Sequence, residues 1–330
     1  LRFENNRLVP GAMSWTIAGA LRRQAKISWL DLRNSGLSVI ERLALEEALL
    51  RHDPLQRMWA MVGTHDPTYG KRINITDAAS SENKNVGCAI VLGIGGKPHE
   101  LLDIDEVRKD GVLAVKRFSG GGTVVVDHDS LFTTFIGRTD GMPDVKPYPR
   151  ELMAWSADEI FGPVFGAMKR DMHDDSIRKR GQRSMVVKGS SCGVESTGIV
   201  ETTEGDKLVR VPNFSLREND YILGERKMGG NAQSIVKGGW IHHTSFLYDY
   251  SHENMGYLTL PKKRPEYRGD RSHRDFLIKL KDYVDPLGGK KYFFDKVKEA
   301  TDDAFEMEEV TLQEALKVVD DELGGFQNWF

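Results

Sequence analysis

The amino-acid sequence predicts a layered α+β fold, and two observations support this class. Helical and strand periodicities both occur along the chain. In its middle part, predicted strands follow one another across short turns, whereas a doubly wound fold would alternate strands with helices. The chain has 330 residues, of which 39% are hydrophobic and 29% charged, and this composition is typical of a globular protein with a sizeable core.

The composition also argues against several classes of protein. The 46 basic and 49 acidic residues give a net charge of −3, so no global charge favours a nucleic-acid partner. Two cysteines cannot form a disulfide framework, and they indicate an intracellular protein, either mitochondrial or cytoplasmic. We expect no membrane association, because no apolar run reaches the roughly eighteen residues of a membrane span.

The first half of the chain is expected to form one long helix and several strands. Residues 1–26 are expected to be an amino-terminal extension or tail, and their basic residues weakly resemble a mitochondrial presequence. Ser38 is expected to cap a helix over residues 38–53, because Glu41 completes a capping box. The other expected elements are strands at 26–32, 57–63, 86–93 and 112–118, a polar loop at 64–85 and a helical turn at 103–111.

The second half mixes hairpins with helices. Residues 171–206 are charged and rich in small residues, which favours an insertion or mobile loop. Residues 221–250 are expected to form two strands joined at a tight Lys-Met-Gly-Gly corner. The other expected elements are strands at 123–127 and 131–137 and helices at 151–170, 274–284 and 310–323.

Three consecutive glycines at Gly120–Gly122 precede a β-branched run. Glycine packs no side chain and weakens a strand. One interpretation is a β-bulge or tight corner that packing requires. Another is a cradle whose backbone N–H groups bind a phosphate. Dinucleotide-binding and Walker motifs are excluded, because these glycines open a strand and no G-x-x-x-x-G-K-[ST] segment occurs.

A second glycine-rich segment follows Lys227. A lysine beside Gly229 and Gly230 is suited to neutralise a phosphate or polarise a carbonyl oxygen. The common alternative is an exposed hairpin lysine. Downstream, His242 and His243 cannot easily bind one metal ion, because neighbouring strand residues point to opposite faces. We expect one of them to face the site and the other the outside.

At these residues the sequence resembles the lipoate–protein ligase A family. The segments RFSGGGTVVVD (117–127), RKMGGNAQ (226–233) and WIHHTSFL (240–247) are similar, in the same order, to motifs of that family. The helix at 38–53, VLGIGGKPHELLDID at 91–105 and PKKRPEYRGDRSHRDFL at 261–277 extend the resemblance, the last of them to a plant- and protist-like branch.

The resemblance implies a biotin/lipoate ligase-type catalytic domain, whose curved mixed sheet is flanked by helices. It places this catalytic ligase domain at residues 27–285, with the insertion or mobile loop of 171–206 inside it. A C-terminal helical segment is expected at 286–330, which is too short for the full accessory domain of bacterial members.

The resemblance also implies a two-step reaction. ATP and Mg²⁺ activate lipoate or octanoate as an acyl-AMP, and a lysine of a lipoyl domain then takes the acyl group. The implied partners are lipoyl domains of 2-oxoacid dehydrogenase E2 subunits or the glycine cleavage H protein. By this resemblance, Lys227 is catalytic and contacts the acyl carbonyl and the phosphate, and Arg117 contacts phosphate. The other implied ATP- and lipoate-binding residues are Ser119, Gly120, Gly121, Gly122, Thr123, Val124, Val125, Asn231 and Ala232.

Several positions depart from the family pattern. Val126 stands where the family has His, Gly229 where Ser is common, and His243 where Gly is usual. Asp127 matches the family's Asp and is a weak candidate for binding magnesium. These departures affect the details of nucleotide contact and leave the expected fold unchanged.

Two other functions remain open. An ATP-independent octanoyl or lipoyl transferase would need a reactive cysteine, for which Cys192 in GSSCG is the candidate, whereas Cys88 lies in an apolar strand. A degenerate homologue would only bind acyl groups or lipoyl domains, but the intact Arg117, glycines and Lys227 argue against it. A biotin ligase is disfavoured because no Gly-Arg-Gly-Arg segment occurs.

Overall fold

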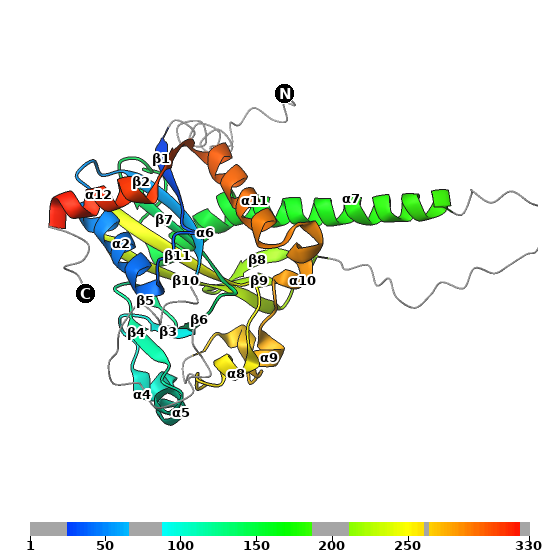
Figure 1. The fold of residues 1–330 in the computed structure, drawn as a ribbon, viewed down its shortest axis with the longest axis horizontal. Coiled ribbons are helices and arrows are strands. Elements are labelled where there is room, and N and C mark those ends of the chain that lie inside the picture. Colours follow the sequence, from blue (N-terminus) through cyan, green and yellow to red (C-terminus); the bar gives the residue numbers. More distant parts are fainter. Residues whose placement is uncertain (1–24, 66–87, 187–210, 261–263, 324–330) are drawn as a thin grey trace, which may run out of the picture.

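A computed structural model describes residues 25–65, 88–186, 211–260 and 264–323. Its centre is a nine-stranded mixed sheet (Figure 1). The strand order is β12 (Glu306–Val310), β1 (Lys26–Asp31), β2 (Met58–Thr64), β7 (Ser130–Arg138), β11 (Gly239–Leu247), β10 (Arg226–Val236), β9 (Asp220–Leu223) and β8 (Phe214–Arg217), with β5 (Gly120–Gly121) also pairing with β10. Strand β1 is parallel to both of its neighbours, and the other pairs are antiparallel.

Helices cover both faces of this sheet, which confirms the predicted α+β class. Along β2 the side chains alternate, so that Trp59 and Met61 join one hydrophobic cluster and Met58 and Val62 another. The first cluster packs under α2 (Val39–His52) and α12 (Leu312–Leu323). On the opposite face lie α6 (Pro149–Ser156), the π-helical segment η1 (Ala157–Phe161), α7 (Gly162–Val186) and α11 (Gly289–Ala304).

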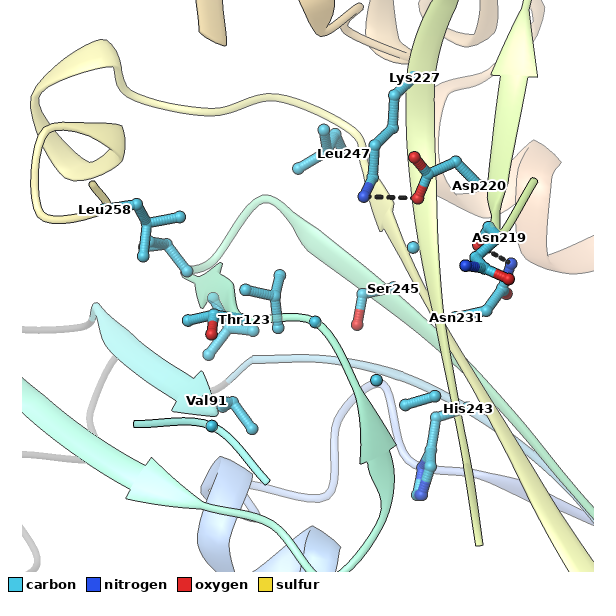
Figure 2. Close-up of a pocket in the computed structure, with 18 of the residues that line it drawn as sticks. Val91, Thr123, Asn219, Asp220, Lys227, Asn231, His243, Ser245, Leu247 and Leu258 are labelled. Carbon is cyan, nitrogen blue, oxygen red and sulfur yellow. Dashed lines mark hydrogen bonds and ion pairs between the residues drawn. The ribbon is translucent and has the colours of Figure 1, made fainter. Parts of the chain in front are cut away.

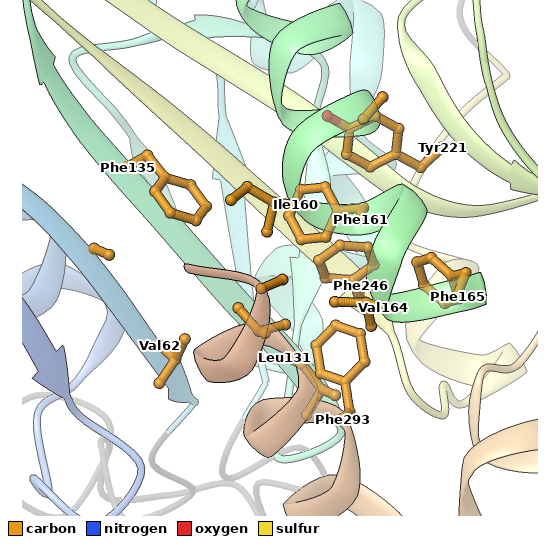
Figure 3. Packing of buried hydrophobic residues seen from close by; sticks show 14 of the residues in the cluster. Val62, Leu131, Phe135, Ile160, Phe161, Val164, Phe165, Tyr221, Phe246 and Phe293 are labelled. Carbon is orange, nitrogen blue, oxygen red and sulfur yellow. The ribbon is translucent and has the colours of Figure 1, made fainter. Parts of the chain in front are cut away.

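Aromatic rings dominate the packing under α7 and α11 (Figure 3). The ring of Phe246 lies 5.0 Å from those of Phe161 and Phe293, centroid to centroid, in edge-to-face contacts. All three side chains are buried. Such pairs add about 0.5–1.5 kcal/mol to the gain from burial. They fix β11, which carries site residues on its other face, against a rigid layer.

A smaller sheet stands beside the main one. It consists of β4 (Leu113–Lys116), β3 (Ala89–Leu92) and β6 (Val124–Val126), with α4 (Pro98–Leu101) and α5 (Ile104–Lys109) between β3 and β4. Val91 and Val126 pack against α2, whereas Ile90 and Val125 pack against the segment that contains α8 (His252–Met255) and α9 (His273–Phe276). The glycine stretch therefore connects two sheets, with β5 in the main sheet and β6 in the small one.

Most of the expected elements are confirmed. The capping box of α2 is present, because Glu41 N–H donates to Ser38 Oγ and Ser38 N–H donates to the Glu41 carboxylate. The expected extension at the amino terminus and the polar loop at 64–85 lie almost wholly outside the described residues. Among the described helices, none is both long and apolar enough to cross a membrane.

Four expectations about secondary structure need correction. The loop expected from residue 171 is helical as far as Val186, because α7 continues without a break, and the rest of 187–206 lies outside the described residues. The C-terminal segment contains β12, which pairs with β1, so the main sheet extends beyond residue 285. The helix expected at 274–284 is two short helices, α9 and α10 (Lys281–Val284). The Lys-Met-Gly-Gly segment lies inside β10 at a bulge, and the turn before it is at Gly224–Glu225.

Candidate active site

A cavity of about 780 Å³ lies beside β10 and β11. Its walls come from the glycine stretch, α2, the small sheet and the segment from Arg264 to Leu277. The lining combines aliphatic and aromatic side chains with five Lys or Arg residues and two acids. Such a mixture of apolar surface and a few charged groups is typical of a site for a small amphipathic ligand. Of the predicted residues, the cavity brings together Arg117, Gly120, Gly121, Gly122, Thr123, Val124, Val125, Lys227, Asn231 and Ala232.

Gly121 and Gly122 differ in the structural reason for which glycine occupies the position. Gly121 has φ +126°, and a Cβ there would lie 2.8 Å from both Arg117 Nη2 and the Asn231 carbonyl oxygen. A Cβ on the facing Gly93 would lie 2.2 Å from the Gly121 carbonyl oxygen. Gly121 is therefore required by backbone conformation and close packing. By contrast, apart from the two chain neighbours, no heavy atom of the described residues lies within 4 Å of a Cβ built on Gly122, which lines the cavity.

Arg117 holds the glycine stretch in shape. The buried guanidinium donates to the carbonyl oxygens of Gly122 at 2.8 Å, Gly120 at 3.4 Å and Val91 at 3.3 Å. Burial lowers its pKa to about 10. These donors point to backbone oxygens, and the predicted contact of Arg117 with phosphate stays a prediction. Ser119 is fully buried and lies outside the cavity lining, where its carbonyl oxygen accepts from Ile94 N–H at 3.0 Å.

Lys227 reaches the cavity from the bulge in β10 (Figure 2). Its Nζ lies 2.7 Å from Asp220 Oδ1 on the neighbouring strand β9. The other oxygen, Asp220 Oδ2, accepts from Tyr267 O–H at 2.8 Å. A Cβ on Gly230 would lie 3.3 Å from Lys227 Nζ, so a glycine leaves room for the ammonium group. The sequence did not identify Asp220 and Tyr267. Their contacts depend on the bulge in β10 and on the position of the segment that contains Tyr267, and neither can be read from the sequence.

Asn231 is placed by hydrogen bonds on both of its polar atoms. Its Nδ2 donates to the Asn219 carbonyl oxygen at 3.1 Å, and its Oδ1 accepts from Thr244 O–H at 2.8 Å. The neighbouring Ala232 pairs with Gly121 of β5 on one side and His243 of β11 on the other. This pairing joins the two predicted motifs at one point of the sheet.

A buried charged cluster supports the base of the cavity. Glu46 on α2 lies 2.6 Å from Arg42 Nη1 and 3.1 Å from His243 Nδ1, and it accepts from Thr134 O–H at 2.7 Å. Burial by itself raises the pKa of Glu46, but the charges of Arg42 and His243 and the hydrogen bonds lower it to about 2. Burial lowers the pKa of His243. The sequence predicted this helix from its capping box, and nothing in its spacing marked Glu46 as a partner of β11.

The two histidines point to opposite faces, as predicted, but His242 does not face the outside. His243 lines the cavity. His242 is fully buried in the core, where its ring nitrogens lie 2.9 Å from Ser156 Oγ and 3.0 Å from Gln233 Nε2. Burial, with the neighbouring His243, lowers its pKa to about 3. The expectation failed because α6 and η1 cover this face of β11.

Two further candidates, Asp127 and Cys88, lie outside the cavity lining. Asp127 accepts from Asp129 N–H at 3.0 Å in the turn between β6 and β7. Cys88 is buried in the core as expected, and burial raises the pKa of its thiol to about 12. Cys192 lies outside the described residues. Within the described ranges, no group of three or more His, Cys, Asp or Glu side chains could hold a metal ion.

Comparisons with known proteins show which family the chain resembles and which solved structures share its fold. Residues 83–158 and 186–306, more than half of the chain, match the model of the lipoyl protein ligase A/B catalytic domain. A relative from Plasmodium falciparum, named inactive lipoate–protein ligase 2, is 24% identical over 271 residues, which cover 75% of this chain and 62% of that protein. The chain thus spans less than two thirds of this relative's length.

Two solved structures share the fold. A lipoate–protein ligase A bound with ATP is 16% identical and has a TM-score of 0.54, with 92% of this chain and 94% of that one covered. A bipartite lipoate protein ligase from Thermoplasma acidophilum, studied with its E2 lipoyl domain, is 16% identical and has a TM-score of 0.55, with 92% of both chains covered. At this level of identity, the likeness establishes the fold alone.

Proposed function

We propose that this chain, which belongs to the lipoyl protein ligase A/B catalytic-domain family, is an ATP-dependent lipoate–protein ligase. It activates lipoate or octanoate with ATP and transfers the acyl group to a lysine of a lipoyl domain. In the first step an acyl carboxylate oxygen bonds to the α-phosphorus, and pyrophosphate leaves. In the second step the lysine amine bonds to the acyl carbon, and AMP leaves.

The position of Lys227 carries this proposal. Lys227 and Gly122, whose Cβ position is open, line the same cavity. A cation and unobstructed backbone in one cavity are suited to stabilise charge on a phosphate and on an acyl carbonyl oxygen. Arg117 acts indirectly in this scheme, because it holds the carbonyl oxygens of Gly120 and Gly122 and so fixes the turn.

The apolar part of the lining supports an acyl substrate. Val91, Leu247, Leu258 and Phe276 line the cavity together with the predicted Val124 and Val125. Burial of apolar surface contributes about 0.8 kcal/mol per methylene group, so an octanoyl or lipoyl chain gains affinity along such a wall. The ATP named with the solved lipoate–protein ligase A and the E2 lipoyl domain named with the Thermoplasma ligase support the same substrates and partner class here. The glycine cleavage H protein remains a proposed alternative partner.

Magnesium would accompany the nucleotide. In nucleotide sites Mg²⁺ is usually bound by one or two carboxylates together with phosphate oxygens and waters. Asp127 lies outside the cavity lining, whereas Glu218 and Asp220 belong to it. We therefore propose these two carboxylates, in place of Asp127, as the residues that could contact a magnesium ion carried by ATP.

A degenerate homologue without catalysis is the second candidate. It is favoured by the name of the Plasmodium relative, which describes that protein as inactive. It is also consistent with the ion pair between Lys227 and Asp220, which a substrate has to compete with. A thioester transferase gains no support from Cys88, because its raised pKa keeps the buried thiol protonated.

Two measurements separate these functions. The ligase should exchange labelled pyrophosphate into ATP only when lipoate or octanoate is present. With an apo E2 lipoyl domain, intact mass spectrometry should then show one added acyl group, and only with ATP. No exchange and no transfer would support the degenerate homologue. Acyl transfer without ATP, through an acyl adduct on Cys192, would support the transferase.

A further inference from the structure

The segment Arg264–Leu277, here called the basic strap, closes one side of the cavity. It is fastened by polar contacts to the turn between β8 and β9 and to the β9–β10 hairpin. Tyr267 O–H donates to Asp220 at 2.8 Å, Tyr267 N–H donates to Glu218 at 3.2 Å, and Arg271 Nη1 donates to the Glu225 carbonyl oxygen at 3.0 Å. The strap is therefore held in one place relative to Lys227 on the same hairpin.

Arg268 is the buried cation of this strap. It lines the cavity, yet the residue is only 6% exposed. The guanidinium stacks on the ring of Phe276 at 4.7 Å. Its Nε makes a long 3.4 Å bond to the Arg271 carbonyl oxygen, and its Nη2 has no hydrogen-bond partner among the described residues. A buried guanidinium without an anion is costly, so this arrangement suits an anionic ligand.

The other cations of the cavity are already engaged. Arg42 is paired with a buried acid, and Arg117 binds three backbone oxygens. Lys227 and Arg264 each contact an aspartate. Of these five lining cations, only Arg117 and Arg268 have no acidic partner within ion-pair distance among the described residues. The Nη2 of Arg117 is bonded to two carbonyl oxygens, whereas the Nη2 of Arg268 has no hydrogen bond there.

We propose that Arg268 binds the β- and γ-phosphates of ATP, the part that leaves as pyrophosphate. This inference rests on the proposed function, which places the α-phosphate at Lys227. His273 of the strap also lines the cavity, and its pKa is lowered by burial and by the charges of Arg268 and Lys227, so the three groups are neighbours. A phosphate chain that starts at Lys227 would continue toward Arg268, whose planar fork can donate two parallel bonds to phosphate oxygens.

Titration calorimetry on the whole chain tests this assignment. MgATP, AMP, inorganic tripolyphosphate and octanoate are titrated in turn into the wild type and into Arg268→Gln, which keeps part of the aliphatic stem and replaces the charged group by a neutral amide. A charge-assisted bond to phosphate corresponds to about 1.5–3 kcal/mol, or roughly 10- to 100-fold in affinity. We expect that loss for MgATP and tripolyphosphate, with AMP and octanoate unchanged.

A control variant removes the same charge nearby. Arg274 lies in the strap, but its side chain is exposed and outside the cavity lining, so we expect wild-type affinities for Arg274→Ala.

The proposal would be overturned if Arg268→Gln weakened the binding of MgATP and AMP equally. A selective loss of octanoate binding, or no change in any affinity, would overturn it as well. If the wild type binds no ATP, the proposed function fails. In that case, tripolyphosphate binding that depends on Arg268 would still support an anion site there. If tripolyphosphate binding did not depend on Arg268, the anion site would be refuted too. Circular dichroism spectra and melting temperatures show whether both variants stay folded. If Arg268→Gln does not fold, Arg268→Lys replaces it in the same titrations.

Discussion

Replacement of Lys227 by alanine should remove most of the adenylation rate while leaving the protein folded. In the structure the ammonium group contacts one acid, Asp220, at 2.7 Å, and the lysine side chain is 28% exposed. A partly exposed ion pair of this kind contributes about 1 kcal/mol at most to folding. The Asp220 carboxylate keeps its hydrogen bond from Tyr267 after the substitution, so it is not left without a partner.

The expected catalytic effect is larger than this. Loss of one preorganised electrostatic donor typically costs 10²–10³ in rate, or about 2.7–4 kcal/mol of transition-state stabilisation. The lipoate-dependent exchange of pyrophosphate into ATP measures this step directly. Lys227→Ala should therefore lower the exchange rate by about 10²–10³, while its melting temperature changes by only a few degrees.

A matched variant separates charge from position. Lys237→Ala removes an exposed lysine from the turn between β10 and β11, and we expect wild-type exchange. An exchange rate that is the same in Lys227→Ala as in the wild type would refute the role assigned to this ammonium group. A loss that is equally large in Lys237→Ala would show that the assay responds to overall charge.

Three further predictions follow from the same geometry. Gly121→Ala should destabilise folding by about 2–4 kcal/mol in denaturant titrations, because φ is +126° and the new Cβ meets two atoms at 2.8 Å. Gly122→Ala, by contrast, should fold normally and lose affinity for ATP. Glu46→Gln should cost about 3 kcal/mol at pH 7 by breaking a buried pair. Because the folded-state pKa of about 2 is below the usual 4.5, this contribution is complete above pH 4.5 and declines as the pH falls toward 2, so the two melting curves should converge in acid. Cys192→Ser should retain ATP-dependent transfer to a lipoyl domain, measured by intact mass, and a hydroxylamine-labile adduct on Cys192 would contradict this.

The fold was predictable where local patterns and tertiary structure agree. The capping box at Ser38, the alternation along β2 and the short turns between strands all specify elements by themselves. The α7 helix was missed beyond residue 170 because its charged and small residues carry no apolar stripe. The β12 strand was missed because its residues are mostly acidic and exposed. Only its pairing with β1 distinguishes it from the solvated end of a helix.

The candidate site was predictable through its glycines and lysine, but not through its acids. A run of three glycines can be recognised from the sequence alone, because glycine weakens a strand and is unusual there. Asp220 and Glu46 look like any surface acids, and only strand pairing brings one to Lys227 and the other to His243. Residues that act through tertiary pairing carry no local pattern from which sequence reasoning could identify them.

The different roles proposed for Arg117 and Lys227 are consistent with their different burial. A phosphate-binding group needs donors that can turn to a ligand, whereas Arg117 directs its donors to the carbonyl oxygens of the turn that carries Gly122. Lys227 has one acidic partner and a partly exposed side chain, so its ammonium can move between Asp220 and an anion without breaking the fold. Loss of Arg117 should therefore disorder the cradle and loss of Lys227 should leave it intact but uncharged. The first is a defect of structure that also abolishes binding, and the second is a defect of rate alone.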